Sequence, residues 1–421
     1  MRSPFSTQSV TRLLFLILLA AGVASAQPGS QTPTNLKIAF IGDQGASKDS
    51  KRVLDLIVSE GADAVVHSGD LDYDDDPQGW EEMINDKLGP NFPYFVSIGN
   101  HDEKAWDGGD GYQARLEARL NRIGLPWDGD LGVNSSVKFR GLQIILVGPG
   151  VMGKNHAEYV RDVLAQDKSV WSIASWHKNM KDMQVGGKDD DAGWDVYRES
   201  RLGGAIIATG HEHSYSRTHL LSNIEDQSVI DTSDTLRVSM GETFVFVNGL
   251  GGKSIREQKR SGAWWASIYT EDQDAKSGVL FGVFNKDGNE RLADFYFKNI
   301  DGEIIDQFQV VSEVEDAVTS VGESGEIVPS DFALEQNYPN PFNPETAIRF
   351  RVPKTMEVKL YVTDLLGRRV RTLVDGTSPA GRRTVVWDGK NALGKALSSG
   401  QYLYTLEAGG LVLTRKLTLL K

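Results

Sequence analysis

Short apolar runs alternate with amphipathic segments through the first half of the chain. Strand-like runs and helical segments follow one another in two rounds, at 35–41, 50–61, 62–70, 77–88 and 93–100, then at 141–150, 156–167, 170–177, 194–204 and 205–213. Further strand-like runs are expected to complete the sheet layers as antiparallel strands, at 242–250, 278–284, 291–300 and 303–310. Such alternation indicates βαβ units whose sheet faces are covered. The pattern predicts an α/β domain over residues 36–310.

The pattern changes after residue 310. The stretch VSEVEDAVTSVGESGEIVPSD is acidic, has no aromatic residue and is interrupted by Gly, Ser and Pro. This composition predicts a linker over residues 311–333. Beyond the linker, apolar and polar residues alternate at period two, with short glycine-containing turns, in the runs 346–352, 357–364, 382–389, 401–409 and 411–420. These runs predict a small immunoglobulin-like all-β domain, a β-sandwich over residues 334–421.

Composition narrows the chemistry that the chain can perform. The 421 residues carry a formal net charge of -13 and include no cysteine. Disulfides, thiolate metal sites and cysteine nucleophiles are therefore excluded. The negative charge, without a long basic patch, argues against nucleic acid as a specific partner. Small anionic substrates remain possible if a metal ion supplies positive charge locally.

The first 26 residues have the features of a secretory signal peptide. Arg2 and Arg12 lie before the apolar stretch LLFLILLAAGVA, which ends in the small-residue sequence ASA at 24–26. An uncleaved membrane anchor is the alternative, although this stretch is shorter than the ~20 residues that a span needs. No other segment is apolar enough to cross a bilayer. We therefore expect an exported mature chain without a transmembrane segment.

Residues with metal-binding side chains follow five of the predicted strands. The blocks are GDQG at 42–45, GDLDY at 69–73, GNHD at 99–102, ASWH at 174–177 and GHEHSYSRT at 210–218. Because ligands bind outside the carboxyl ends of strands in α/β sheets, we expect these blocks to face one crevice. A carboxylate such as Asp43 at the end of a buried strand is costly unless something positive meets it. Oxygen donors mixed with imidazoles suit zinc or transition metals, and their number implies two ions.

In this order the five blocks resemble those of the calcineurin-like metallophosphoesterase superfamily, and within it the purple acid phosphatase branch. Most of the superfamily has a metal-binding histidine in the first block where this chain has Gly45. In the purple branch a tyrosine of the second block fills that vacancy, and Tyr73 stands at that position. The resemblance implies a four-layer αββα sandwich over roughly residues 36–310.

The resemblance also implies the residues of a binuclear centre. The first ion would be bound by Asp43, Tyr73 and His213, with Asp70 bridging, and the second by Asp70, Asn100, His177 and His211. His101 would contact the phosphate and help the leaving group as the catalytic residue. A phenolate ligand favours iron at the first site, and the second would hold zinc, manganese or iron. The implied activity is that of an acid phosphatase-like enzyme hydrolysing phosphomonoesters by a metal-bound hydroxide.

Other interpretations of these residues stay open. Asp43 and Asp70 both precede helical segments and would also serve as helix caps. Tyr73 would otherwise be an exposed aromatic residue of an acidic loop. A phosphodiesterase or nucleotidase on the same dimetal site is the alternative activity. From a different class, the chain would be a surface binding protein with a degenerate site.

One part of the resemblance is incomplete. Plant-type members of the purple branch have further histidines soon after the ASWH block, where this chain has Gly186 and Gly187. The candidates to supply the lost positive charge are Lys178, Lys181 and Lys188.

The carboxyl end carries a second resemblance. The stretch LEQNYPNPFNPET at 334–346 and the ending LTRKLTLLK resemble the type A carboxyl-terminal sorting domain of the type IX secretion system. This resemblance implies passage through the periplasm to the cell surface or medium, with the type IX machinery as a partner. The phosphatase resemblance implies small phosphorylated substrates as the other partners. An accessory β-domain that binds carbohydrate or acts as a spacer is the alternative.

Overall fold

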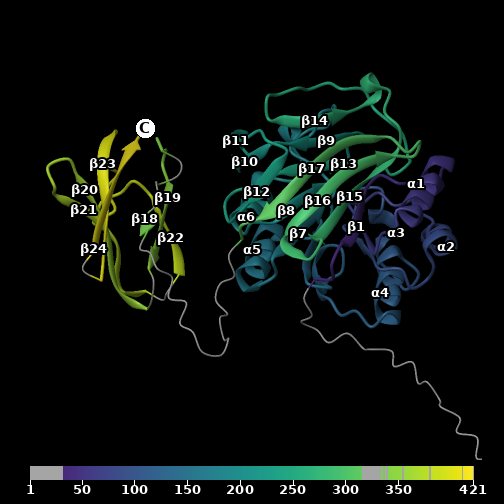
Figure 1. Cartoon of the computed structure of the whole chain (residues 1–421), viewed down its shortest axis with the longest axis horizontal. Coiled ribbons are helices and arrows are strands. Elements are labelled where there is room, and N and C mark those ends of the chain that lie inside the picture. Colours follow the sequence, from purple (N-terminus) through teal and green to yellow (C-terminus); the bar gives the residue numbers. More distant parts are fainter. Residues whose placement is uncertain are drawn as a thin grey trace, which may run out of the picture. The chain divides into compact units, whose positions relative to one another are not determined.

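The computed structural model describes residues 32–314, 333–334, 337, 340–352, 355–378, 381–409 and 411–420. The chain forms two compact units that divide between residues 315 and 316 (Figure 1). The predicted signal peptide and most of the predicted linker lie outside the described residues. Within the described ranges, no helix is both long and apolar enough to cross a membrane.

Two large mixed sheets form the first unit. The first sheet has the order β12 (Thr235–Val238), β17 (Ile304–Ser312), β16 (Asn289–Asn299), β15 (Gly278–Lys286), β1 (Leu36–Ile41), β2 (Ala64–His67) and β3 (Tyr94–Val96). The second has the order β14 (Trp265–Tyr269), β9 (Tyr215–Thr218), β13 (Val245–Asn248), β8 (Ile206–Thr209), β7 (Trp171–Trp176), β6 (Leu142–Val147), β5 (Asn134–Phe139) and β4 (Asp128–Asp130). A separate ribbon pairs β10 (Leu220–Asn223) with β11 (Ser228–Asp231).

Helices cover both sheets. They are α1 (Lys48–Ser59), α2 (Pro77–Leu88), α3 (Glu103–Trp106), α4 (Tyr112–Arg122), α5 (His156–Gln166) and α6 (Trp194–Leu202), with 3₁₀ turns η1 (Lys181–Met183) and η2 (Glu271–Gln273). Helices α1 and α4 contact strands of the first sheet, whereas α5 and α6 contact strands of the second. Between the sheets, the rings of Phe40 and Phe246 meet edge to face with centroids 5.2 Å apart. This α/β arrangement confirms the predicted fold class of the first unit.

Strand register brings the ends of the central strands together. Strands β1, β2 and β3 are parallel, and Ile41 pairs with His67, which in turn pairs with Val96. In the second sheet, β7 and β8 are also parallel, and Trp176 pairs with Thr209. Residues that directly follow these strands therefore leave each sheet at one edge, as parallel pairing requires.

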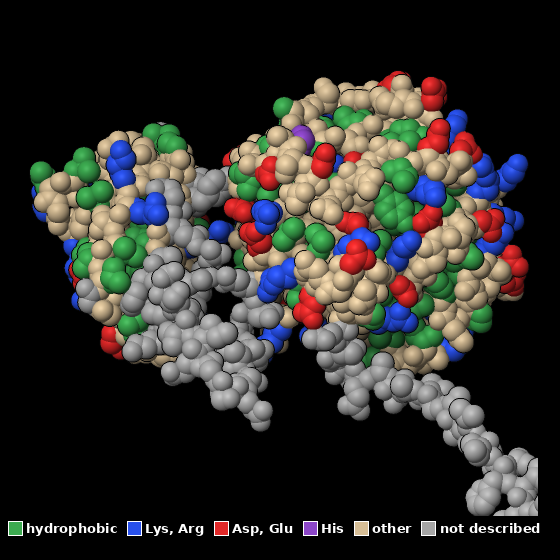
Figure 2. Space-filling model, viewed as in Figure 1, with side chains coloured by type: hydrophobic (Ala, Val, Ile, Leu, Met, Phe, Trp, Pro, Cys, Tyr) green, Lys and Arg blue, Asp and Glu red, His purple; other side chains and the backbone are tan. Residues whose placement is uncertain are grey.

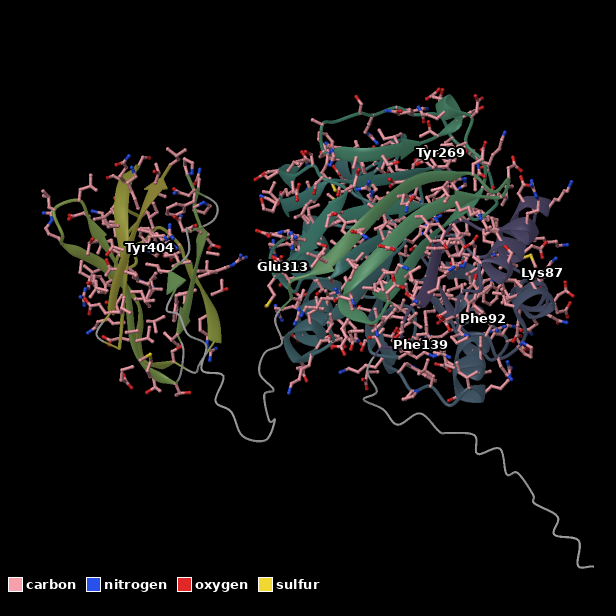
Figure 3. All side chains as sticks on the ribbon, in the orientation of Figure 1. Lys87, Phe92, Phe139, Tyr269, Glu313 and Tyr404 are labelled. Atoms are coloured by element: carbon pink, nitrogen blue, oxygen red, sulfur yellow. The ribbon has the colours of Figure 1, made fainter. Side chains whose placement is uncertain are left out.

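The boundary of the first unit differs slightly from the expected residue 310. Strand β17 continues to Ser312, because Val238 of β12 pairs with Ser312. Glu313, labelled in Figure 3, then forms an ion pair with Arg237 at 2.8 Å. The sheet thus extends into the first residues of the stretch predicted as a linker.

The second unit is all β, as predicted. A three-stranded sheet has the order β18 (Ala333–Leu334), β19 (Thr346–Val352) and β22 (Gly381–Trp387), and a four-stranded sheet has the order β21 (Arg369–Ser378), β20 (Met356–Asp364), β23 (Gly400–Ala408) and β24 (Leu411–Leu419). Tyr404 belongs to the buried core of this unit (Figure 3), and its hydroxyl accepts a hydrogen bond from the backbone N–H of Asn337. Phe342 of the NYPNPFNP motif is buried beside Trp387. Phe342 is therefore part of the core of this unit.

Candidate metal centre

The residues predicted as metal ligands follow strands of both sheets. Residue Asp43 follows β1, Asp70 and Tyr73 follow β2, Asn100 follows β3, His177 follows β7, and His211 and His213 follow β8. The expected crevice therefore lies where the carboxyl ends of strands from two sheets meet, and not along a single open sheet.

Three of these side chains form a first cluster. The hydroxyl of Tyr73 lies 3.0 Å from Oδ1 of Asp43 and 3.0 Å from Nε2 of His213. Nε2 of His213 lies 3.1 Å from Oδ1 of Asp43. Tyr73 is half-buried and directs its hydroxyl into this cluster, unlike the exposed loop residue considered as its alternative. One phenol, one carboxylate and one imidazole thus direct a donor atom at the same point.

A second cluster lies around Asp70. Its Oδ2 is 3.3 Å from Nε2 of His177, which is 3.0 Å from Nδ1 of His211. Ligand atoms of these three buried residues all lie within 4.8 Å of one another. The side-chain oxygen of Asn100 is buried and has no hydrogen-bond partner among the described residues. An unsatisfied buried oxygen is uncommon and is explained if a cation binds it.

The donor set fits metal ions. In two of the three histidines, the ring nitrogen that faces away from the clusters is already engaged: Nδ1 of His177 contacts the carbonyl oxygen of Ser68 at 2.7 Å, and Nδ1 of His213 contacts the hydroxyl of Ser254 at 2.6 Å. Such contacts orient these two imidazoles and leave their Nε2 atoms available to a metal. The combination of carboxylate, amide, phenol and imidazole donors is that of zinc or a transition metal.

The backbone is strained at several of these positions. Positive φ angles occur at Asp43 (56°), Asp70 (60°), Tyr73 (71°) and His211 (68°). Non-glycine residues rarely adopt this conformation, and it clusters at functional sites. Gly99 relieves crowding nearby, because a Cβ there would lie 2.2 Å from the backbone nitrogen of Asp70. The chain thus accepts local strain where it brings the donor atoms together.

Charges in the clusters compensate one another only in part. Burial raises the pKa of Asp43, but the adjacent His213 holds it below the usual range. Burial disfavours the charged form of His177, yet the Asp70 carboxylate raises its pKa to about 9. Burial and the carboxylates of Asp43 and Asp70 raise the pKa of Tyr73. Tyr73 therefore stays neutral unless a strongly Lewis-acidic ion replaces its proton.

Asp102 supports the centre and was given no role by the sequence analysis. Its buried carboxylate accepts hydrogen bonds from the backbone N–H groups of Asp70 (2.9 Å), Leu71 (2.8 Å) and Gly99 (2.7 Å). These contacts join the loop after β2 to the loop after β3. Asp102 is therefore a positioning residue for Asp70 and Asn100. Its position as the last residue of the GNHD block could have identified it as a residue of the site from the sequence.

His101 is exposed beside the centre. Its backbone N–H donates to Oδ1 of Asp70 at 2.9 Å, and its ring lies against that of Tyr73 with centroids 4.5 Å apart. Its side chain is thus accessible to a substrate bound at the clusters, unlike the buried imidazoles of His177 and His211.

Helix capping does not account for the two aspartates. The N-cap of α1 is Ser47 and the N-cap of α2 is Asp76, whose carboxylate accepts from Gly79 N–H. Asp43 and Asp70 direct their carboxylates into the clusters. The capping alternative is therefore wrong for both.

The three candidate lysines differ in whether they pair with an acidic side chain. Lys178 pairs with Asp191 at 3.8 Å and Lys181 pairs with Asp190 at 3.6 Å. Lys188 forms no ion pair with a described residue and lines a pocket together with Glu212 and Arg256. Burial and the charge of Arg256 lower its pKa, while the carboxylates of Asp43, Glu212 and Asp70 oppose the shift. Of the three lysines, Lys188 is therefore the best candidate to supply the positive charge that the missing histidines would have carried.

Arg256 and Glu212 were not singled out by the sequence analysis. The Arg256 guanidinium donates to the carbonyl oxygen of His211 at 3.1 Å and lies 3.4 Å from Nε2 of His213. Glu212 stands between these two histidines in the sequence, and its carboxylate is 3.6 Å from Arg256. Burial raises the pKa of Glu212, although Arg256 and Lys188 oppose this effect.

Part of each unit matches a known family. Residues 36–215 match the family described as Calcineurin-like phosphoesterase. Residues 340–410 match the FlgD Ig-like domain. No curated protein matches the chain by sequence.

Solved structures similar to this chain include a plant enzyme. Purple acid phosphatase PPD1 from yellow lupin (Lupinus luteus) seeds is 16% identical with a TM-score of 0.53, over 72% of this chain and 59% of that chain. The likeness is one of fold, and the chain spans less than two thirds of the lupin enzyme. PhoD (12% identity, TM-score 0.41, 69% of this chain and 76% of that chain) is more distant. PorZ of Porphyromonas gingivalis is also more distant, with 13% identity and a TM-score of 0.16 over 34% of this chain and 21% of that chain.

Proposed function

We propose that the chain is a binuclear metal-dependent phosphatase that hydrolyses phosphomonoesters. The observation that carries the proposal is the pair of donor clusters, one around Asp43 and one around Asp70, at the meeting strand ends of a calcineurin-like phosphoesterase domain. The ions would be held by Asp43, Tyr73 and His213, by Asp70 as the bridge, and by Asn100, His177 and His211. The proposed metals are iron at the first site and zinc, manganese or iron at the second.

The protein's own residues would prepare the reaction. When bound, the two ions would neutralise the phosphoryl oxygens and lower the pKa of a water molecule. Lys188 would add positive charge toward the phosphate from the pocket side, where it has no other described partner. His101 is accessible and would donate a proton to the departing oxygen. Asp102 holds the loops of the ligands in place, so that little rearrangement is needed when substrate binds.

A substrate panel tests this function. Metal-loaded protein should hydrolyse phosphomonoesters faster than phosphodiesters, and the reverse order would favour the phosphodiesterase alternative. The variant His101→Ala should keep both metals and lose on the order of a hundredfold in rate, the scale of a lost general acid. His219→Ala removes a histidine outside the clusters and serves as the control. Loss of metal in His101→Ala would contradict the role given to His101.

We also propose that the protein is exported through the type IX secretion system to the cell surface or medium. The support is the signal-like residues 1–26 and the NYPNPFNP motif at 337–344, whose Phe342 packs in the second unit.

The visible face in Figure 2 shows acidic and basic side chains interspersed over the first unit, without a continuous basic stripe. This surface agrees with small phosphorylated substrates in preference to nucleic acid.

A further inference from the structure

A pocket of about 400 Å³ adjoins the candidate metal centre. Its lining includes Glu212, Lys188, Arg256 and Ile255. Arg256, which lines the pocket, lies 3.4 Å from Nε2 of the proposed ligand His213, so the pocket and the candidate metal centre are neighbours. The volume is within the range of sites that bind small molecules, roughly 300 to 1,000 Å³.

The carboxylate of Glu212 is the unusual feature of this pocket. The residue is 1% exposed, and neither carboxylate oxygen has a hydrogen-bond partner among the described residues. Its nearest cation, Arg256, lies 3.6 Å away. Burying a carboxylate without hydrogen bonds costs free energy. A ligand that donates a hydrogen bond to Glu212 would offset this cost.

The surroundings are built to hold this carboxylate. A Cβ on Gly186 would lie 2.1 Å from Cδ of Glu212 and 2.3 and 2.4 Å from its oxygens, so only glycine leaves room for it. The loop that carries Gly186 is fixed by Arg260, whose guanidinium donates to the carbonyl oxygens of Gly186 and Lys188, both at 2.7 Å. The site is therefore a fixed arrangement and not an exposed side chain on the surface.

The chemistry of the ligand follows from what a carboxylate can accept. The carboxylate oxygens of Glu212 accept hydrogen bonds, and a phosphoryl group bound at the metals offers acceptor oxygens too. A hydroxyl on the group that is esterified to the phosphate supplies a donor of the kind that these buried oxygens lack. We propose that this pocket binds the alcohol part of the substrate, and that Glu212 accepts a hydrogen bond from a further hydroxyl on it. Polyol phosphates are then the preferred substrate class, a specificity that rests on the proposed phosphatase function.

A matched pair of substrates tests the inference. Glycerol 1-phosphate and propyl phosphate differ only in the hydroxyls of the alcohol. Wild-type protein should prefer glycerol 1-phosphate by about 10- to 100-fold in kcat/KM, the scale of a hydrogen bond to a buried charged group. Glu212→Gln keeps the shape but loses the charge and one acceptor oxygen, so it should reduce the preference about tenfold. Its metal content should equal that of the wild type.

The control variant is Glu313→Gln, which makes the same change outside the pocket. Glu313 is exposed and pairs with Arg237 at 2.8 Å. This variant should leave the preference unchanged. Equal kcat/KM values for the two substrates in the wild type, or a changed metal content in Glu212→Gln, would overturn the inference.

A binding measurement separates this inference from the proposed function. Calorimetry with metal-loaded protein should show tighter binding of 2,3-dihydroxypropylphosphonate than of propylphosphonate, by about tenfold or more. If the wild type hydrolyses no phosphomonoester but keeps this preference, the proposed reaction is wrong and the pocket assignment stands. If it hydrolyses both esters and binds both phosphonates equally, the reaction stands and the pocket assignment is wrong.

Discussion

Replacing Asp102 by asparagine should weaken both the fold and the metal centre. The buried carboxylate accepts three backbone hydrogen bonds, at 2.7, 2.8 and 2.9 Å. Asparagine has one acceptor oxygen, and its amide group would face at least one N–H donor. Each hydrogen bond to a charged group contributes about 1.5 to 3 kcal/mol, so one or more lost bonds should cost about 2 to 4 kcal/mol. Metal affinity should fall about 10- to 100-fold, the usual effect of changing a group that orients ligands.

Urea unfolding of the metal-free protein measures the first effect, and metal titration measures the second. Unfolding should be followed at pH 9, because burial and the Asp70 charge raise the pKa of Asp102 to about 8 and the carboxylate is ionised above that value. Asp76→Asn is the matched control. Asp76 is exposed and caps α2 by accepting from Gly79 N–H at 3.0 Å, a role that asparagine fills almost equally well. Equal effects of the two variants would refute the role assigned to Asp102.

Further predictions address acid stability, colour and export. Burial lowers the pKa of His67 to about 3, so the folded state favours the neutral imidazole. The contribution of neutral His67 to the free energy of unfolding is therefore complete above pH ~6.5 and is lost as the pH falls toward 3. In metal-free protein His67→Phe should flatten the decline in stability between pH 6 and 4.5, by at most ~1.4 kcal/mol per pH unit, and an unchanged slope would contradict this. Iron-loaded protein should absorb visible light through phenolate-to-iron charge transfer, and Tyr73→Phe should abolish the band; colourless, iron-free wild type with full activity would refute iron ligation by Tyr73. A chain ending at residue 329 should keep its activity, because the two units are compact on their own, but should remain in the periplasm; its appearance in the medium would contradict the sorting role.

The central strands and the blocks after them were predictable because their signals are local. The apolar run that forms β1 and the acid that follows it can be recognised without knowing what they contact. The same is true of β2, β3, β7 and β8, whose predicted and observed positions agree. Helix α4 was not predicted, although its buried residues Tyr112, Leu116 and Leu120 recur every four residues and are a local signal of an amphipathic helix.

Other features depend on tertiary contacts and leave no local signal. Strand β9 is fully buried yet polar, because Arg217 on it pairs with Asp306 of β17 at 2.7 Å. Lys178 and Lys181 pair with aspartates in the folded chain, whereas Lys188 forms no ion pair with a described residue. The sequence alone does not show which of the three lysines is paired. The unpaired carboxylate of Glu212 likewise becomes visible only once the loop of Gly186 is placed against it.

The central claim is that two metal ions act together at the donor clusters around Asp43 and Asp70. Titration of metal-free, full-length protein with metal, while phosphomonoester hydrolysis is measured in the same samples, tests it most directly. If Asp70 bridges two ions as proposed, activity should rise until two ions are bound per chain and then stay constant. Full activity with one bound ion per chain would contradict the binuclear account.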